Sequence, residues 1–312
     1  PEYVVTRGES FDIKATAEGS LEGASLSMDG KPLALEVSGN HASARAVADA
    51  DGERTIELAM QGKRTWARVL VVPPEDALID ARLKFILAKQ QRIADGDPLD
   101  GAYLSFDNET DLQVYAERPH DHNAARERVG MGVLAAMYYR TCRDPAFRTE
   151  IEKSVRRFAR FLEREIEDEN GVIYGTVGRR HPERLYNFPW VAQFHLEMHR
   201  AFNEEAHLDR MVRVIRAYYA RGGEKFYAIG LPVRSSLAAL EAAGRTSERV
   251  ELLKLYRAHA DQILATGTDY PTSEVNYEQS IVAPAVQLLL EVYLATDEPQ
   301  YLEGAKKQMP LL

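Results

Sequence analysis

Four short strings of charged, polar and aromatic residues carry the side chains in this sequence that could do chemistry. They are ERPHDHNAARER (117–128), RLYNFPW (184–190), GLPVRSS (230–236) and TDYPTSEVNYEQ (268–279). Each string comes just before an apolar run with helical spacing. Loops of this kind, gathered at one end of stacked helical hairpins, would form a single functional mouth. The pattern favours an enzyme over a scaffold.

The first string places titratable groups at the start of a helix. Pro119 disfavours a helical conformation for the residue before it, so we expect the helix to begin near Asp121. The residues that would gather at this helix N-terminus are Arg118, His120, Asp121 and His122. A helix N-terminus attracts anionic ligands, so the group suits acid–base chemistry on a carboxylated substrate. The alternative is that Asp121 is only an N-cap.

Two carboxylates in the fourth string are four residues apart. Glu274 and Glu278 share one face if the helix begins before residue 274. Tyr270 and Tyr277 flank them, as the walls of a sugar site would. Asn276 could instead begin a capping box, and both interpretations can hold together. We place at least one of the two glutamates in the mouth.

The other two strings supply aromatic and cationic groups. Tyr186 and Trp190 could stack on the face of a sugar ring. Arg234 comes just before a predicted helix, and with Arg118 and Arg126 it could clamp a carboxylate. The physical basis is that a guanidinium binds a carboxylate through two parallel hydrogen bonds.

Composition narrows the classes of function. The net charge of −9 over 312 residues disfavours a nucleic-acid partner. The single cysteine, Cys142, excludes an intramolecular disulfide and a multi-cysteine zinc site. Motifs for phosphate binding, serine hydrolysis and redox thiols are absent from the sequence. We expect no cofactor and no bound metal, and no apolar stretch reaches membrane-spanning length.

The first 73 residues differ in character from the rest. Short segments of alternating apolar and polar residues are separated by Gly, Asn and Asp turn signals. We expect residues 1–73 to form a small β-sandwich of immunoglobulin-like type that ends before Pro74. We assign this domain an accessory structural role, with glycan binding as the alternative.

From residue 74 onward the spacing of apolar residues becomes helical. The predicted helices cover residues 75–94, 123–141, 146–168, 185–202, 206–221, 234–243, 246–266, 278–295 and 298–312. The helices that follow the four strings would form the inner ring of an (α/α)6-type helical-hairpin toroid, and the others its outer ring. The fold class is therefore mainly α, with a small N-terminal β-domain. Because fewer than six hairpins are present, we expect the toroid of residues 74–312 to be incomplete and truncated at its C-terminus.

Three of these segments carry a resemblance to a known family. Behind a small β-domain, RPHDHNAARERVGMG, YNFPW and PTSEVNYEQSIVAPA resemble the bacterial six-hairpin glycosidases. The chain looks most like the (α/α)6 enzymes that act on uronic-acid-containing glycans, of the β-glucuronidase and unsaturated glucuronyl hydrolase types. The resemblance implies a glycan substrate and a toroid with its active site at the mouth.

We predict a glycoside hydrolase that cleaves a uronic-acid-containing glycan. Two carboxyl groups would act at the mouth, one as the acid and the other as a base or nucleophile. The candidates for these carboxyl groups are Asp121, Glu274 and Glu278. The candidates for substrate binding are Arg118, His120, His122, Arg126, Tyr186, Trp190, Arg234 and Tyr277.

Three alternatives stay open. In a polysaccharide lyase, His120, His122 and Tyr277 would lead, because a cationic group neutralises the uronate and a base removes the adjacent proton. A sugar epimerase would use His195 as a second base, and a helical glycan-binding module would have no catalytic group. The predicted partner is an oligo- or polysaccharide, and homo-oligomerisation is left open. We expect a secreted or periplasmic location, without excluding the cytoplasm.

Overall fold

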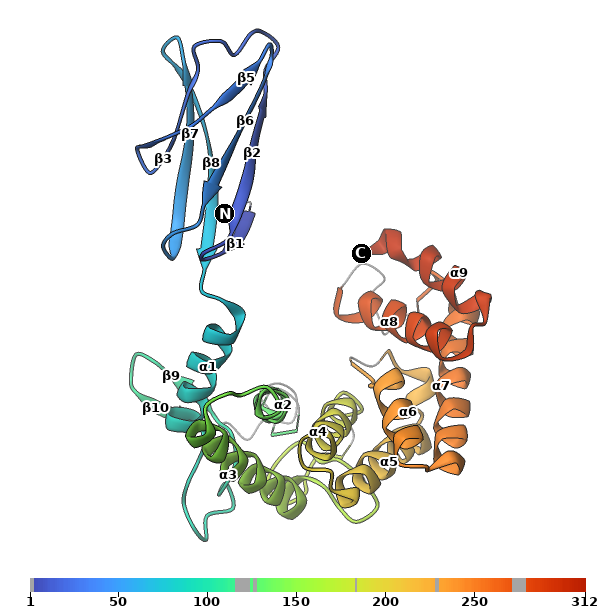
Figure 1. The fold of residues 1–312 in the computed structure, drawn as a ribbon. Coiled ribbons are helices and arrows are strands. Elements are labelled where there is room, and N and C mark those ends of the chain that lie inside the picture. The colour runs from blue at the N-terminus through green and yellow to red at the C-terminus, as the bar shows by residue number, and fades with distance from the viewer. Residues whose placement is uncertain (1–2, 116–123, 126–127, 183, 228–229, 271–278) are drawn as a thin grey trace. The chain divides into compact units, whose positions relative to one another are not determined.

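The chain is built of two compact units, Pro1–Arg82 and Leu83–Leu312. The computed structural model describes residues 3–115, 124–125, 128–182, 184–227, 230–270 and 279–312 (Figure 1). In the described residues, the first unit consists mainly of strands and the second mainly of helices. Helix α1 (Glu75–Phe85) spans the boundary between them.

Two β-sheets form the first unit. One sheet has the strand order β1–β8–β7–β3–β4, and the other has the order β2–β6–β5. The strands are β1 (Tyr3–Thr6), β2 (Ser10–Thr16), β3 (Ser25–Met28), β4 (Lys31–Leu33), β5 (Glu36–Ser38), β6 (His41–Val47), β7 (Gly52–Met60) and β8 (Lys63–Val72). Strand β1 pairs with β8 in parallel, whereas β7 pairs with β8 antiparallel.

The two sheets share one apolar core. Leu26, Ile56 and Val69 of the larger sheet pack with Ala44 of the smaller sheet. In β6 every second residue is buried, as expected for a strand with one face on a core. The first unit is therefore a β-sheet region in which residues of both sheets pack together, and its assignment as an immunoglobulin-like sandwich stays a prediction.

Helical hairpins form the second unit. The helices are α2 (Val129–Tyr139), α3 (Pro145–Phe161), α4 (Asn187–Phe202), α5 (Glu205–Ala220), α6 (Val233–Ala242), α7 (Thr246–Thr266), α8 (Gln279–Thr296) and α9 (Pro299–Gln308). Shorter elements are the π-helical turns η1 (Ile86–Gln90) and η2 (Leu162–Ile166), the 3-10 turns η3 (Gly223–Lys225) and η4 (Met309–Leu311), and the hairpin β9 (Ser105–Asp107) with β10 (Leu112–Val114). Of the described helices, none combines the length and apolarity that crossing a bilayer requires.

The hairpins are arranged as two rows of helices (Figure 1). Helix α2 contacts α4, α4 contacts α6, and α6 contacts α8, which together form the inner row. In the outer row α5 contacts α7 and α7 contacts α9. Helix α2 carries no charged residue, as suits a helix with neighbours on several sides, whereas α3 is amphipathic. This arrangement confirms the predicted helical-hairpin toroid class.

One predicted boundary is wrong. The helix expected over 123–141 covers only Val129–Tyr139, and residues 124, 125 and 128 form turns. The N–H of Ala124 donates to the carbonyl of Gly175 at 2.9 Å, so this stretch bonds to a distant loop rather than to α2. A tertiary hydrogen bond overrides the local helical pattern here.

Gly132 allows α2 to pack closely on its neighbours, because a Cβ there would lie 2.7 Å from Phe158 and 3.0 Å from Phe194. Gly132→Ala should therefore lower the free energy of unfolding by about 1–3 kcal/mol through overpacking. Gly130→Ala in the same helix is the control, since its Cβ would lie 3.4 Å from Trp190 and alanine favours helix. Chemical denaturation measures both, and equal losses would contradict the packing argument.

Candidate functional site

The candidate site is the mouth, which we define as the N-terminal ends of α2, α4, α6 and α8 with the loop residues before them. Successive inner helices contact each other, and each is followed by an outer helix that returns in the opposite direction. In the sequence, each of the four polar strings leads into one of these helices. The start of α6 lies beside the C-terminal parts of α4 and α8, because Arg200 donates to the carbonyl of Ser235 and the N–H of Arg234 donates to Glu291.

Most of the predicted site residues lie outside the described residues. They are Arg118, His120, Asp121, His122, Arg126, Glu274, Tyr277 and Glu278. Their roles stay predictions from the sequence. The described members of the predicted set are Tyr186, Trp190 and Arg234.

Tyr186 and Trp190 come together at the start of α4. Trp190 lies in the first turn of this helix and packs against α2 beside Gly130. Its indole Nε1 is buried and has no hydrogen-bond acceptor among the described residues. The ring of Tyr186 contacts the ring of Phe226 edge to face, with 4.5 Å between centroids. Both aromatic side chains therefore pack near the start of α4, and their stacking on a sugar stays a prediction.

Arg234 lies in the first turn of α6 and its side chain is exposed. Its backbone N–H donates to Glu291 Oε2 of α8 at 3.0 Å. This bond joins the start of α6 to the C-terminal part of α8 (Gln279–Thr296). The guanidinium of Arg234 takes no part in this bond. The clamp function of Arg234 stays a prediction from the sequence.

The structure adds mouth residues that the sequence analysis did not select. Arg128 directly precedes α2, and its side chain is only 3% exposed. The guanidinium carbon lies 5.0 Å from the ring centroid of Tyr115, which is a cation–π contact. Asn187 begins α4 and is fully buried. Arg128 and Asn187 belong to the strings quoted above, so the sequence marks the right segments but not these residues.

Buried polar atoms without partners gather around the starts of α2 and α4. Among the described residues, Tyr115 Oη, Thr176 Oγ1 and Trp190 Nε1 are buried and make no hydrogen bond. Their segments meet here, because Tyr115 stacks with the residue before α2 and the loop of Thr176 bonds to Ala124. A buried polar group left unpaired costs about 1–3 kcal/mol. These three atoms are therefore polar groups whose partners lie outside the described residues.

A second aromatic group lies near the starts of α6 and α8. The rings of Tyr227 and Tyr270 stack with 4.8 Å between their centroids. Tyr270 Oη donates to Gln308 Oε1 at 2.6 Å. Burial, and to a smaller extent the neighbouring Tyr227, raises the pKa of Tyr270 to about 12. Tyr270 is therefore neutral at pH 7.

A buried group of charged residues lies away from solvent. His195 is fully buried, with Nε2 donating to Glu167 Oε2 at 2.6 Å and Nδ1 lying 3.0 Å from Nδ1 of His207. Arg210 bonds to the other oxygen of Glu167 at 3.2 Å. Burial, with the nearby charge of His195, lowers the pKa of His207 to about 3.

Both ring nitrogens of His195 are engaged, one with Glu167 and the other with His207, and the side chain is fully buried. These contacts disfavour the epimerase hypothesis, which needs His195 as a second base. The group instead joins α4, α5 and the end of η2. In the described part of the chain, no three His, Cys, Asp or Glu residues are placed to hold a metal ion.

Comparisons with known proteins identify a similar fold. No protein-family model and no curated protein matches the chain. Among solved structures it is similar to a polysaccharide lyase, at 34% identity and a TM-score of 0.89, over 99% of this chain and 46% of that chain. It also matches a family 76 glycoside hydrolase from a bovine Bacteroides thetaiotaomicron strain, at 9% identity and a TM-score of 0.49, over 99% of this chain and 76% of that one.

The chain thus spans less than half the length of the lyase that it resembles. The class that the fold and the site define is a helical-hairpin toroid of the kind used by glycan-processing enzymes.

Proposed function

We propose that this chain cleaves a uronic-acid-containing polysaccharide by β-elimination. The observation that supports this proposal is its likeness, over nearly all of its residues, to a polysaccharide lyase. The hydrolase predicted first from the sequence depends on Asp121, Glu274 and Glu278, none of which is among the described residues. The lyase chemistry, in contrast, has candidate groups in the described part of the mouth.

β-Elimination needs a cation and a base. The base removes the proton from the carbon next to the uronate carboxylate, and the bond to the leaving glycosidic oxygen breaks. A carbon–carbon double bond forms, and the leaving oxygen takes up a proton. Negative charge grows on the carboxylate during proton removal, so a fixed cation beside it lowers the barrier.

Arg128 is our candidate for that cation. It is permanently charged, lies directly before α2 and is almost fully buried, so water screens it little. Its planar guanidinium can bind the uronate through two hydrogen bonds. The neighbouring aromatic residues Tyr186 and Trp190 would contact the flat faces of the sugar rings.

Tyr115 is our candidate for the base among the described residues. Its phenol oxygen is buried and has no partner among them. The guanidinium carbon of Arg128 lies 5.0 Å from the centroid of its ring, so the candidate cation and the candidate base are neighbours. His120, His122 and Tyr277 are the alternatives that the sequence predicts for the same step.

Incubation with polygalacturonate or alginate tests the proposal. We expect an unsaturated product that absorbs in the ultraviolet, with one new reducing end for each double bond formed. Tyr115→Phe should lower the rate at least 100-fold if the phenol is the base, because a general base contributes about 10²–10⁴-fold. Full activity in Tyr115→Phe would move the base to His120, His122 or Tyr277.

The products also distinguish the other functions. Reducing ends without ultraviolet absorbance would mean hydrolysis, and a rate lost in Asp121→Asn would then support the two-carboxylate mechanism. Tight binding of these polymers without any product would indicate a glycan-binding helical module.

A further inference from the structure

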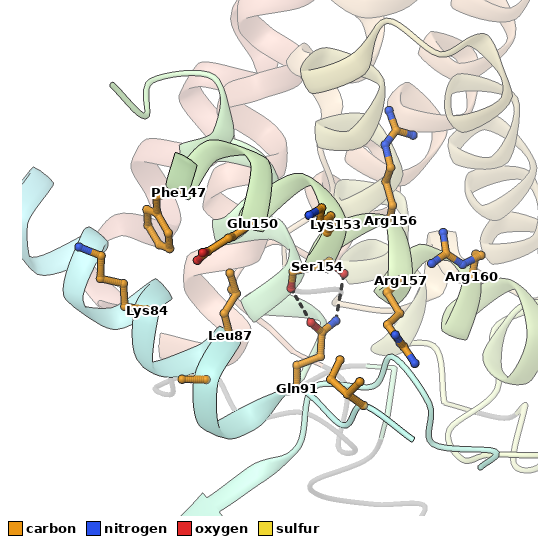
Figure 2. Close-up of a pocket in the computed structure, with 12 residues that line it drawn as sticks. Lys84, Leu87, Gln91, Phe147, Glu150, Lys153, Ser154, Arg156, Arg157 and Arg160 are labelled. Atoms are coloured by element: carbon orange, nitrogen blue, oxygen red, sulfur yellow. Dashed lines mark hydrogen bonds between the residues drawn. The ribbon is translucent and has the colours of Figure 1, made fainter. Parts of the chain in front are cut away.

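A groove lies on the outer side of the second unit, between η1 and α3 (Figure 2). Its volume is about 880 Å³. Leu87, Ala88 and Ile93 give it an apolar strip, and Ile93 is 58% exposed. At its floor the amide of Gln91 bonds twice to Ser154, which accepts at its carbonyl (3.0 Å) and donates from its hydroxyl (2.7 Å). The groove is thus a fixed feature of the packing between two outer helices.

The groove is positively charged, although the chain as a whole is negative. Five of its twelve lining residues are basic and one is acidic. The basic residues are Lys84, Lys153, Arg156, Arg157 and Arg160, and the acidic residue is Glu150. The whole chain has a net charge of −9. A local positive surface on an acidic protein attracts anionic partners selectively.

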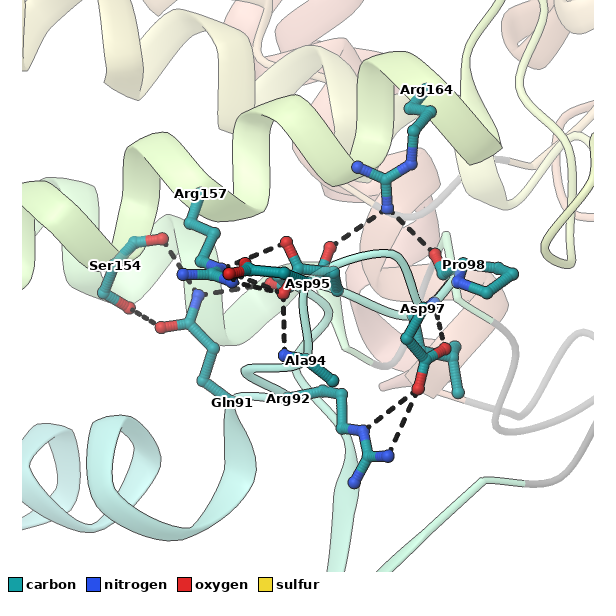
Figure 3. A network of polar contacts seen from close by, with 12 residues as sticks. Gln91, Arg92, Ala94, Asp95, Asp97, Pro98, Ser154, Arg157 and Arg164 are labelled. Atoms are coloured by element: carbon teal, nitrogen blue, oxygen red, sulfur yellow. Dashed lines mark hydrogen bonds and ion pairs between the residues drawn. The ribbon is translucent and has the colours of Figure 1, made fainter.

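Two of these arginines are held by carboxylates. Arg157 bonds to Asp100 at 3.0 Å and to Asp95 at 2.5 Å, which fixes the loop after η1 against α3 (Figure 3). Arg156 bonds to Glu152 at 2.9 Å and to Glu204 at 2.7 Å. Both arginines therefore build the wall of the groove, and their charge is largely compensated.

Lys153 and Arg160 differ from these two. Both side chains are exposed, and neither has a hydrogen bond, ion pair or ring contact among the described residues. They are seven residues apart on α3, so they lie on the same side of the helix at a separation of about 10 Å. That distance is comparable with the length of a disaccharide.

We propose that this groove binds a carboxylated polysaccharide outside the mouth. The two uncompensated cations would each bind a uronate carboxylate, while the apolar strip contacts the C–H faces of the sugar rings. The choice of ligand rests on the proposed function. Along the chain, η1 is followed by the hairpin β9–β10 that precedes Tyr115, and α3 continues through η2 toward Thr176.

Affinity for polygalacturonate and alginate tests the groove without requiring turnover. We expect Lys153→Gln combined with Arg160→Gln to weaken binding about five- to tenfold, by titration calorimetry at low salt. Lys254→Gln combined with Lys307→Gln removes the same charge from exposed sites on α7 and α9, and should bind like the wild type. On polymer, the groove variant should show a raised KM with an unchanged kcat.

The following outcomes would contradict the proposal that the groove binds a carboxylated polysaccharide. Equal affinity of both double variants would do so, as would failure of the wild type to bind either polymer. Binding of poly(L-glutamate) as tightly as polygalacturonate would mean that the surface attracts any polyanion. If the wild type binds the polymers through the groove but forms no product, the proposed β-elimination is contradicted. The proposal that the groove binds polysaccharide would still be supported.

Discussion

Glu167→Gln is expected to lower the free energy of unfolding by about 3 kcal/mol. The carboxylate has no exposed surface and bonds to both His195 and Arg210. Burial raises the pKa of Glu167, but His195 and Arg210 outweigh this effect and lower it, so the group is ionised in the folded chain. Removing one partner of a buried ion pair leaves the other charge uncompensated, which costs about 3–5 kcal/mol. Urea denaturation at pH 7 measures the loss.

Glu163→Gln is the matched control. Glu163 bonds to the same Arg210 at 3.2 Å, but its side chain is 32% exposed. Exposed ion pairs contribute about 0–1 kcal/mol, so the same chemical change should have a small effect here. If both variants lose a similar amount of free energy of unfolding, burial does not determine how much the ion pair of Glu167 contributes to stability.

Arg128→Met is expected to lower kcat/KM on a uronate polymer by about 100- to 1000-fold. Methionine keeps the apolar stem of the side chain but removes the charge that would neutralise the substrate carboxylate. Loss of a single group that stabilises developing charge typically has an effect of this size. The value of kcat/KM is measured from initial rates of increase in ultraviolet absorbance. Circular dichroism checks that the variant is folded.

Arg128→Lys and Arg216→Met serve as controls. The lysine variant keeps the charge but loses the two-bond geometry, so we expect an intermediate rate. Arg216 pairs with Glu251 between the outer helices α5 and α7, and its replacement should leave kcat/KM within about twofold of the wild type. A folded Arg128→Met variant with full activity would exclude Arg128 from the reaction.

The sequence alone predicted much of the fold, because its patterns depend on residues close together in the chain. The spacing of Val155, Phe158 and Leu162 predicted an amphipathic helix, and α3 buries these side chains with its π-helical end. Alternation in β6 predicted a strand with one buried face. The same patterns predicted the hairpins and the strings that precede the inner helices.

The start of α2 could not be predicted in this way. The residues before Val129 fit a helical pattern, but Ala124 bonds to Gly175, about fifty residues away in the sequence. The site residues were hard to predict for the same reason, because their contacts are with residues distant in the sequence. Nothing local indicated that Arg128 would be buried over Tyr115 or that Thr176 would lie in the mouth.

By itself, the sequence therefore determined the type and order of the elements and the segments that form the mouth. Only the tertiary structure decided which charges are buried, which are compensated and which are exposed. His195 bonds to a glutamate 28 residues earlier, and Arg157 to an aspartate 57 residues earlier. The physical reason is that burial and pairing depend on contacts between distant segments, whereas helix and strand periodicity depends on near neighbours.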